Sequence, residues 1–183
     1  MSRREIVITG IGCVTPLGGD PDATWAGLAA GRSGVRTIEP FDASGFPTTF
    51  AGQIDAIPAL DGPWEAARQR WADADLMDRK THLALVAARQ AWEQAGGVHG
   101  GLGAIDAPSR RVAVCLGSEG GRRLLEEMAS RALTYDGASL DALLPSLPPG
   151  EWARLRASHP TRVLATELGI TGPTRTVCTA CTS

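Results

Sequence analysis

Short apolar and β-branched runs predict strands at four places along the chain, namely Glu5–Thr9, Phe50–Ile54, Val112–Leu116 and Thr174–Val177. The first and third runs have the unbroken apolar pattern of strands buried in a sheet. Glycines follow both of them, at Gly10 and Gly12 and at Gly117, as expected where a buried strand ends in a tight turn.

Between these runs, apolar residues recur at the spacing of amphipathic helices. The predicted helices are Asp20–Gly31, Gly62–Asp75, Asp78–Ala95, a segment around Leu124–Met128, and Thr161–Leu168. We expect Gly62–Asp75 to be a surface helix because it is polar, and we expect Pro145–Gly150 to be a loop. Alternating strands and helices predict an α/β fold, in which helices cover a sheet.

Two of these helices have predicted caps and buried faces. Asp20 and Pro21 fit an N-cap and the first helical residue, and Trp25, Leu28 and Ala29 share the face that we expect to be buried. In Asp78–Ala95, the clearest helix, Leu83, Ala87 and Ala91 lie one turn apart, and two glycines follow.

Composition favours a single soluble globular domain over the 183 residues, 43% of which are hydrophobic and 21% charged. The net charge of −2 and the lack of a basic run argue against nucleic-acid or anionic-membrane partners. No apolar run is long enough for a membrane helix, and Glu5 with two glycines argues against a signal peptide at the N-terminus. The four scattered cysteines indicate reduced thiols in a cytoplasmic protein.

The candidate nucleophile is Cys181, in the stretch Thr179–Ser183 that follows the last predicted strand. A thiol where a strand turns into a helix is exposed to backbone N–H groups and the helix dipole, which favour the reactive thiolate. The same N–H groups can hold the oxyanion that forms when a thiolate adds to a thioester carbonyl. Small neighbouring residues leave room for a sharp turn and for a substrate. The chain ends two residues later.

Cys178 and Cys181 also form a C-x-x-C pattern, which is found in thiol–disulfide centres and in half of a zinc site. A thioredoxin-like pair needs a following helix and fold, and a zinc site needs a second pair of ligands. We therefore interpret Cys178 as a buried strand residue that faces away from its immediate neighbours. We interpret Cys13 and Cys115 as inert thiols in or beside buried strands.

Other motifs have structural interpretations. Gly10 and Gly12 lack the third glycine and the acidic residue of a dinucleotide-binding turn, and Gly117–Gly121 lacks the Lys-Ser/Thr of a phosphate loop. The histidines, His82, His99 and His159, show no metal-ligand spacing, so we expect surface or capping roles and no metal site.

Taken together, these stretches resemble the N-terminal half of β-ketoacyl synthases, the thiolase-fold condensing enzymes of fatty-acid and polyketide assembly. The matching segments occur in the family's order and are Arg4–Gly12 with Thr15–Gly18, Thr24–Gly34, Phe41–Asp42 with Phe50–Gly52, Met77–Ala88, Arg111–Gly121, and Gly172–Ser183. The form Thr-Ala-Cys-Thr-Ser is similar to that of the stand-alone bacterial elongating enzymes. Residues 136–159 match the family pattern poorly.

The resemblance implies that residues 1–183 form a β-ketoacyl synthase N-terminal domain, a thiolase-like half with a five-stranded mixed sheet, cut just after the nucleophile. It implies that Cys181 accepts an acyl group from an acyl carrier protein and that a Claisen condensation with malonyl-carrier follows. No cofactor is expected, since the phosphopantetheine belongs to the carrier. In the family, two histidines, a lysine and the second oxyanion donor lie beyond the cysteine, outside this chain.

The resemblance also implies a homodimer, or a heterodimer with a related synthase subunit, formed around the strand Thr174–Cys178. Two hypotheses remain open. The chain is part of a condensing enzyme, which alone would be inactive, or it is a non-catalytic homologue that acts as a dimerisation or binding module. Retention of Cys181 among small residues favours the enzyme.

Overall fold

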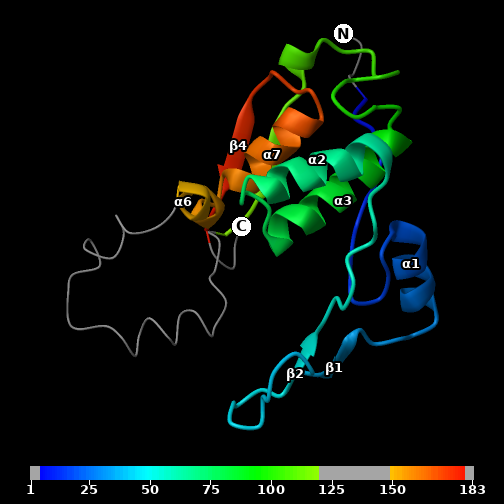
Figure 1. Cartoon of the computed structure of the whole chain (residues 1–183). Helices are drawn as coiled ribbons and strands as arrows, with labels where there is room; N and C mark the ends of the chain where they lie inside the picture. Colours follow the sequence, from blue (N-terminus) through cyan, green and yellow to red (C-terminus); the bar gives the residue numbers. More distant parts are fainter. Residues whose placement is uncertain (1–4, 120–148, 180–183) are drawn as a thin grey trace.

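The computed structural model describes residues 5–119 and 149–179. Their helices lie on one side of a pair of parallel strands, and a separate pair of antiparallel strands forms an arm (Figure 1). In chain order the elements are α1 (Pro21–Ala29), β1 (Val35–Thr37), β2 (Phe50–Gly52), α2 (Gly62–Asp73), α3 (Arg79–Gln94), a 3-10 turn (Ser109–Arg111), β3 (Val114–Gly117), α6 (Pro149–Leu155), α7 (His159–Glu167) and β4 (Thr174–Val177).

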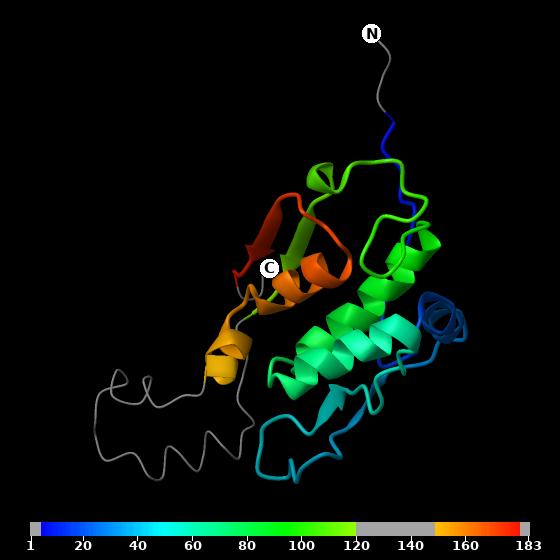
Figure 2. The same ribbon diagram turned by 45° about the horizontal axis from the view of Figure 1, so that its top comes forward.

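The parallel pair β3–β4 is the part of the fold that positions the candidate site. Val114 is aligned with Thr174 and Gly117 with Val177, so both strands end at the same edge. Helix α7 contacts both strands and also packs on α3 (Figure 2). The Thr161 hydroxyl on α7 lies 2.7 Å from the Thr176 hydroxyl on β4, which ties the helix to the last strand.

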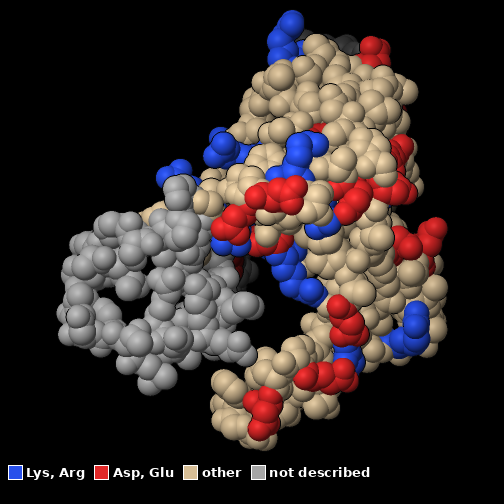
Figure 3. Space-filling view, in the orientation of Figure 1, with Lys and Arg blue, Asp and Glu red and all other residues tan. Residues whose placement is uncertain are grey.

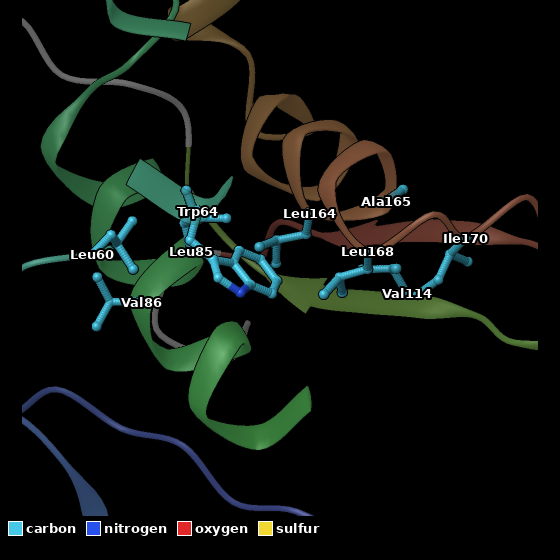
Figure 4. Close-up of a cluster of buried hydrophobic side chains, with 9 residues drawn as sticks. All are labelled: Leu60, Trp64, Leu85, Val86, Val114, Leu164, Ala165, Leu168 and Ile170. Atoms are coloured by element: carbon cyan, nitrogen blue, oxygen red, sulfur yellow. The ribbon is translucent and has the colours of Figure 1, made fainter. Parts of the chain in front are cut away.

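The hydrophobic core fills the space between α2, α3, α7 and β3 (Figure 4). Its buried members are Leu60, Trp64, Leu85, Val86, Val114, Leu164, Ala165, Leu168 and Ile170. Leu85 is fully buried at the middle of α3. The core confirms the predicted layering of helices on strands, but it contradicts the surface position expected for α2, because Trp64 of that helix is 3% exposed.

The Asp20 cap predicted from sequence is confirmed, and Asp78 caps α3 in the same way. The Asp20 carboxylate accepts a hydrogen bond from the Ala23 amide at 2.7 Å, and the Asp78 carboxylate accepts one from the Thr81 amide at 2.8 Å. The buried positions of α3 are Thr81, Leu85 and Val86, so the inward face is rotated from the predicted one. This rotation arises because two separate layers, the core and the N-terminal segment, pack on α3.

The predicted strand at Glu5–Thr9 is wrong for the described structure. The segment is extended but unpaired, and Ile6 and Ile8 are 96% and 83% exposed. A strand needs a neighbour for its amides, and no strand of the described residues lies beside this segment. Directly after it, side chains of α3 take the place of a strand, since Gln94 and Gln90 accept hydrogen bonds from the amides of Ile11 and Cys13.

Gly10 and Gly12 allow this segment to lie directly against α3. A Cβ atom at Gly12 would lie 1.9 Å from the Ala87 carbonyl oxygen, and one at Gly10 equally close to that of Ala91. The predicted tight turn is thus a close contact with the backbone of α3, which only glycine allows at these two positions.

Gly12→Ala is therefore expected to lower the free energy of unfolding by about 1–3 kcal/mol through overpacking. Urea unfolding followed by circular dichroism measures the change, and hydrogen exchange at the Ile11 and Cys13 amides should accelerate. Gly45→Ala is the matched control, because a Cβ there meets nothing within 4 Å. Equal losses in the two variants would contradict the packing argument.

The predicted buried face of α1 is also wrong. Trp25 and Leu28 are 71% and 56% exposed, and Gly27 is the buried residue of this helix, against the side chain of Leu17. Helical spacing identified a common face correctly, but among residues 5–119 and 149–179 no layer covers that face.

Strand β2 confirms the prediction at Phe50–Ile54, although it ends at Gly52, and it pairs with β1, which the sequence did not indicate. Together they form an arm that extends away from the core in Figure 1. The described residues thus contain two separate two-stranded sheets, instead of the five-stranded sheet that the family resemblance implies.

The remaining boundaries differ by a few residues. Helix α7 begins at His159, two residues before the predicted start. Helix α6 includes Pro149 and Gly150, which the sequence assigned to a loop. The rest of that loop and the predicted helix around Leu124–Met128 lie outside the described residues.

Candidate functional site

The candidate site lies where β3 and β4 end together. The Ser118 amide donates a hydrogen bond of 3.0 Å to the Val177 carbonyl, so the parallel pairing continues to the last residue of β4. Ligands of α/β sheets bind outside the carboxyl ends of the strands, where loops from neighbouring strands meet. β4 therefore leads the chain into such an edge at Cys178 and Thr179. Cys181 itself lies outside the described residues.

A hollow of about 520 Å³ opens at this edge. Its wall combines apolar groups with a polar rim, and it is lined by Asp78, Arg79, Lys80, Leu83, Ala84, Leu116, Gly117, Ser118, Glu119 and Pro160. This size and composition are typical of small-molecule sites. The rim comes from the first turn of α3 and from the residues after β3, so elements far apart in sequence form it.

Lys80 joins three elements at the rim. Its Nζ donates to the carbonyl oxygens of Glu119 at 3.1 Å and Arg154 at 3.4 Å, and it lies 3.8 Å from the Asp78 carboxylate. Burial lowers the pKa of Lys80, while the electrostatic interactions with Asp78 and Cys178 oppose that decrease. No sequence pattern predicted a role for this lysine, because its partners come together only in the folded chain.

The structure corrects the expected burial of two cysteines. Cys178 is exposed beyond the end of β4, and Cys115 is exposed on β3. Cys115 is aligned with Arg175 and faces away from α7, which covers the other face of the pair, and Cys178 follows the last residue of β4. Cys13 is half-buried, with its thiol 3.5 Å from the Thr24 hydroxyl.

The histidines have three different environments. His159 is buried, and its Nε2 lies 2.6 Å from the Leu76 carbonyl, which contradicts the expected surface role. His99 lies 2.7 Å from the Glu167 carboxylate and edge-on to Trp64. His82 is half-buried in the first turn of α3, and its Nε2 has no hydrogen-bond partner within the described part of the chain.

His82 predicts a pH dependence of stability. Burial is the main cause that lowers its pKa; Arg68 and Arg79 act in the same direction and Glu65 opposes them. At His82 the folded chain thus binds fewer protons than the unfolded chain. The free energy of unfolding therefore begins to decrease as the pH falls through the unfolded pKa of about 6.5. Urea midpoints between about pH 7 and 5 should decrease in the wild type and decrease less in His82→Gln. An unchanged slope in the variant would contradict this origin.

Glu167 centres a buried polar cluster that the sequence analysis missed. Its carboxylate, 2% exposed, accepts hydrogen bonds from Trp71 Nε1 at 2.6 Å and from Arg70 Nη2 at 3.1 Å, and contacts His99 Nε2 at 2.7 Å. A signal was present, because Glu167 follows Val163 and Leu164 at helical spacing on the core face of α7. The donors hold α2, α7 and the loop after α3 together.

Within residues 5–119 and 149–179, no group of His, Cys, Asp and Glu side chains could hold a metal ion. The same part of the chain contains no helix long and apolar enough to cross a membrane. On the face in Figure 3, basic and acidic side chains are interspersed over the body of the molecule.

Residues 3–183 match the family model described as the beta-ketoacyl synthase N-terminal domain. The chain belongs to the β-ketoacyl synthase family. It is 33% identical over 185 residues to 3-oxoacyl-(acyl-carrier-protein) synthase 2 of Coxiella burnetii, and 32% identical over 190 residues to the tetracenomycin polyketide synthase ketoacyl synthase alpha subunit of Streptomyces glaucescens. Both matches cover 100% of this chain and 40% of the relative.

Solved structures agree with this membership. The ishigamide ketosynthase/chain length factor superposes with a TM-score of 0.65 at 28% identity, over 97% of this chain and 40% of that one. A beta-ketoacyl synthase from Burkholderia phymatum gives the same TM-score at 20% identity, which supports the fold alone. The expected α/β, thiolase-like N-terminal architecture is confirmed. The chain spans about 40% of the length of these relatives.

Proposed function

We propose that this chain supplies the acyl-accepting nucleophile of a β-ketoacyl synthase and that Cys181 is that nucleophile. The observation that carries the proposal is the parallel pairing of β3 and β4, whose common carboxyl edge lies at Val177, four residues before Cys181 in the sequence. Membership of the β-ketoacyl synthase family supports the reaction class.

In the proposed reaction, the Cys181 thiolate attacks the carbonyl carbon of an acyl-carrier thioester. The tetrahedral intermediate then expels the carrier thiolate, which leaves the acyl group on Cys181. In the condensation step, a malonyl-carrier loses CO₂, and the resulting carbanion forms a carbon–carbon bond with the acyl carbonyl. The Cys181 thiolate departs as the new β-ketoacyl-carrier forms. Covalent catalysis thus divides one difficult bond formation into two easier steps.

The proposed partner is an acyl carrier protein, whose phosphopantetheine arm brings the thioester, so the chain needs no cofactor of its own. The names of relatives from fatty-acid and polyketide synthases support both pathways as candidates. We propose a homodimer, or a heterodimer with a related subunit, that forms along β4 in the cytoplasm. In the described structure β4 pairs with β3 alone and has a free edge, and one structural neighbour is a ketosynthase/chain length factor.

Acyl loading tests this function. The protein, purified as its own gene produces it, is incubated with an acyl-carrier-protein thioester, and its intact mass is measured. We expect a gain of one acyl group, which peptide mass spectrometry locates on Cys181. A wild-type protein that gains no acyl group but still associates through β4 would support the alternative, a non-catalytic dimerisation or binding module.

A further inference from the structure

The exposed large hydrophobic side chains of this chain are concentrated near its start. Within residues 5–119 and 149–179, all of them except Val98 and Trp152 lie in residues 5–50, which we call the N-terminal layer. They include Ile6 and Ile8 of the extended segment, Trp25 and Leu28 of α1, and Phe50 of the arm. Single apolar residues are normal on a surface, but a concentration of this kind marks a contact surface.

The N-terminal layer is attached to the rest of the chain by its backbone. Its first segment and α1 lie on the side of α3 that faces away from α7 and β4 (Figures 1 and 2). Gly10 and Gly12 lie directly against the backbone of α3. Only Gly27 and Ala43 of the layer are buried. Its inner side therefore consists of backbone and small residues, and its large apolar side chains face the solvent.

The segment Glu5–Thr9 adds an unpaired backbone to this surface. It is extended, and no strand of the described residues pairs with it. The side chains of Ile6, Val7 and Ile8 are all exposed. Because successive side chains of an extended segment point to opposite sides, both faces of the segment are uncovered. Such a segment can pair with a strand of another polypeptide, and the new backbone hydrogen bonds would hold the two together.

The charge of the N-terminal layer limits what can cover it. Acidic residues outnumber basic ones, since the acidic residues are Glu5, Asp20, Asp22, Glu39 and Asp42 and the basic ones are Arg32 and Arg36. Two copies that met through this same surface would place like charges opposite each other. An anionic lipid surface would repel it as well. The charges and the exposed apolar groups together favour a different protein surface.

We propose that the N-terminal layer is the interface for the C-terminal part of a β-ketoacyl synthase. The family model that this chain matches is that of an N-terminal domain, and the chain covers only 40% of the Coxiella burnetii relative. The relative therefore has a further part, longer than the matched one, that can cover a surface of this extent. The proposal rests on family membership and on the exposed side chains, and it does not depend on the role of Cys181.

The test co-expresses the tagged 183-residue chain with the part of the Coxiella burnetii synthase that follows the matched segment. We expect a one-to-one complex, whose mass light scattering measures, and amide hydrogen exchange at Glu5–Thr9 that is at least about 10-fold slower in the complex. Leu28→Lys should weaken the complex at least about 10-fold, because it places a charge in an apolar interface.

Val98→Lys is the matched control for Leu28→Lys. Its side chain is 53% exposed, against 56% for Leu28, but it lies outside the N-terminal layer. We expect this variant to bind like the wild type. Because both side chains are exposed in the chain alone, circular dichroism of the two variants should show the wild-type fold.

Three results would overturn the interface. The first is that the wild-type chain forms no complex, and the second is that Leu28→Lys and Val98→Lys bind equally well. The third is a dimer of the chain alone that Leu28→Lys converts into monomers, which would make a second copy the occupant. Acyl loading separates this proposal from the proposed function. A complex that never loads an acyl group refutes the role of Cys181 alone, and a chain that loads without binding the second polypeptide refutes the interface alone.

Discussion

Cys181→Ala is expected to reduce acyl loading at least about 1000-fold, because alanine has no nucleophile to form the thioester. Alanine lacks only the sulfur atom of the cysteine side chain, so we expect the urea midpoint to change little. Intact mass after incubation with acyl-carrier thioester measures loading, and circular dichroism measures unfolding. If acyl loading and stability are lost together, the variant has a folding defect. Cys181→Ser then tests the chemistry, because serine preserves the size and hydrogen-bonding capacity of the residue.

Cys115→Ala is the matched control for this variant. It removes an exposed thiol from β3, on the face that points away from α7. We expect loading equal to that of the wild type. Undiminished labelling of Cys181→Ala would refute the assignment of the nucleophile, and labelling lost only in Cys115→Ala would transfer the role to that cysteine.

Glu167→Ala should have the largest effect on stability, a decrease of about 3 kcal/mol in the free energy of unfolding. Most of this decrease comes from Trp71 and His99, whose partly buried N–H donors would have no acceptor in the variant. Arg70 contributes less, because its side chain is 61% exposed and water can replace the carboxylate.

Urea unfolding of Glu167→Ala, Glu167→Gln and the control Glu39→Ala measures this difference. Glutamine keeps an oxygen that accepts from Trp71 and should retain part of the stability. Glu39 forms an ion pair with Arg36 on the surface arm, so its loss should leave the midpoint unchanged. Equal midpoints for Glu167→Ala and Glu39→Ala would contradict a structural role for the buried carboxylate.

Local signals predicted the helices well. Asp20 caps α1 as expected, and α3 begins directly after Asp78, the start given by the sequence pattern, because both signals depend on residues within one turn. Burial was less predictable, since it depends on which layer lies opposite. Trp25 and Trp64 both lie on helices with apolar positions, yet the first is exposed and the second lies in the core. Nothing in the local pattern distinguishes them.

The candidate site could be predicted only in part. The strand Thr174–Val177 and its exit toward Cys181 followed from local sequence, and β4 confirms the strand. The hollow did not follow, because Lys80, Leu116 and Pro160 come from three separate elements. At Glu5–Thr9 a local signal was present but did not predict the structure. A run of β-branched residues has strand propensity, but pairing requires a neighbour that the local sequence does not specify.

The register of β3 and β4 has a consequence for synthesis on the ribosome. Val114 pairs with Thr174, 60 positions further along the chain. At translation rates of 5–20 residues per second, β3 leaves the ribosome about 3–12 s before its partner has been made. Closure of so long a loop costs conformational entropy, and the contacts between β3 and β4 offset this cost only after the loop has closed. The edge that forms the candidate site is therefore assembled late, and slow codons between the two strands would prolong the exposure of β3 to chaperones.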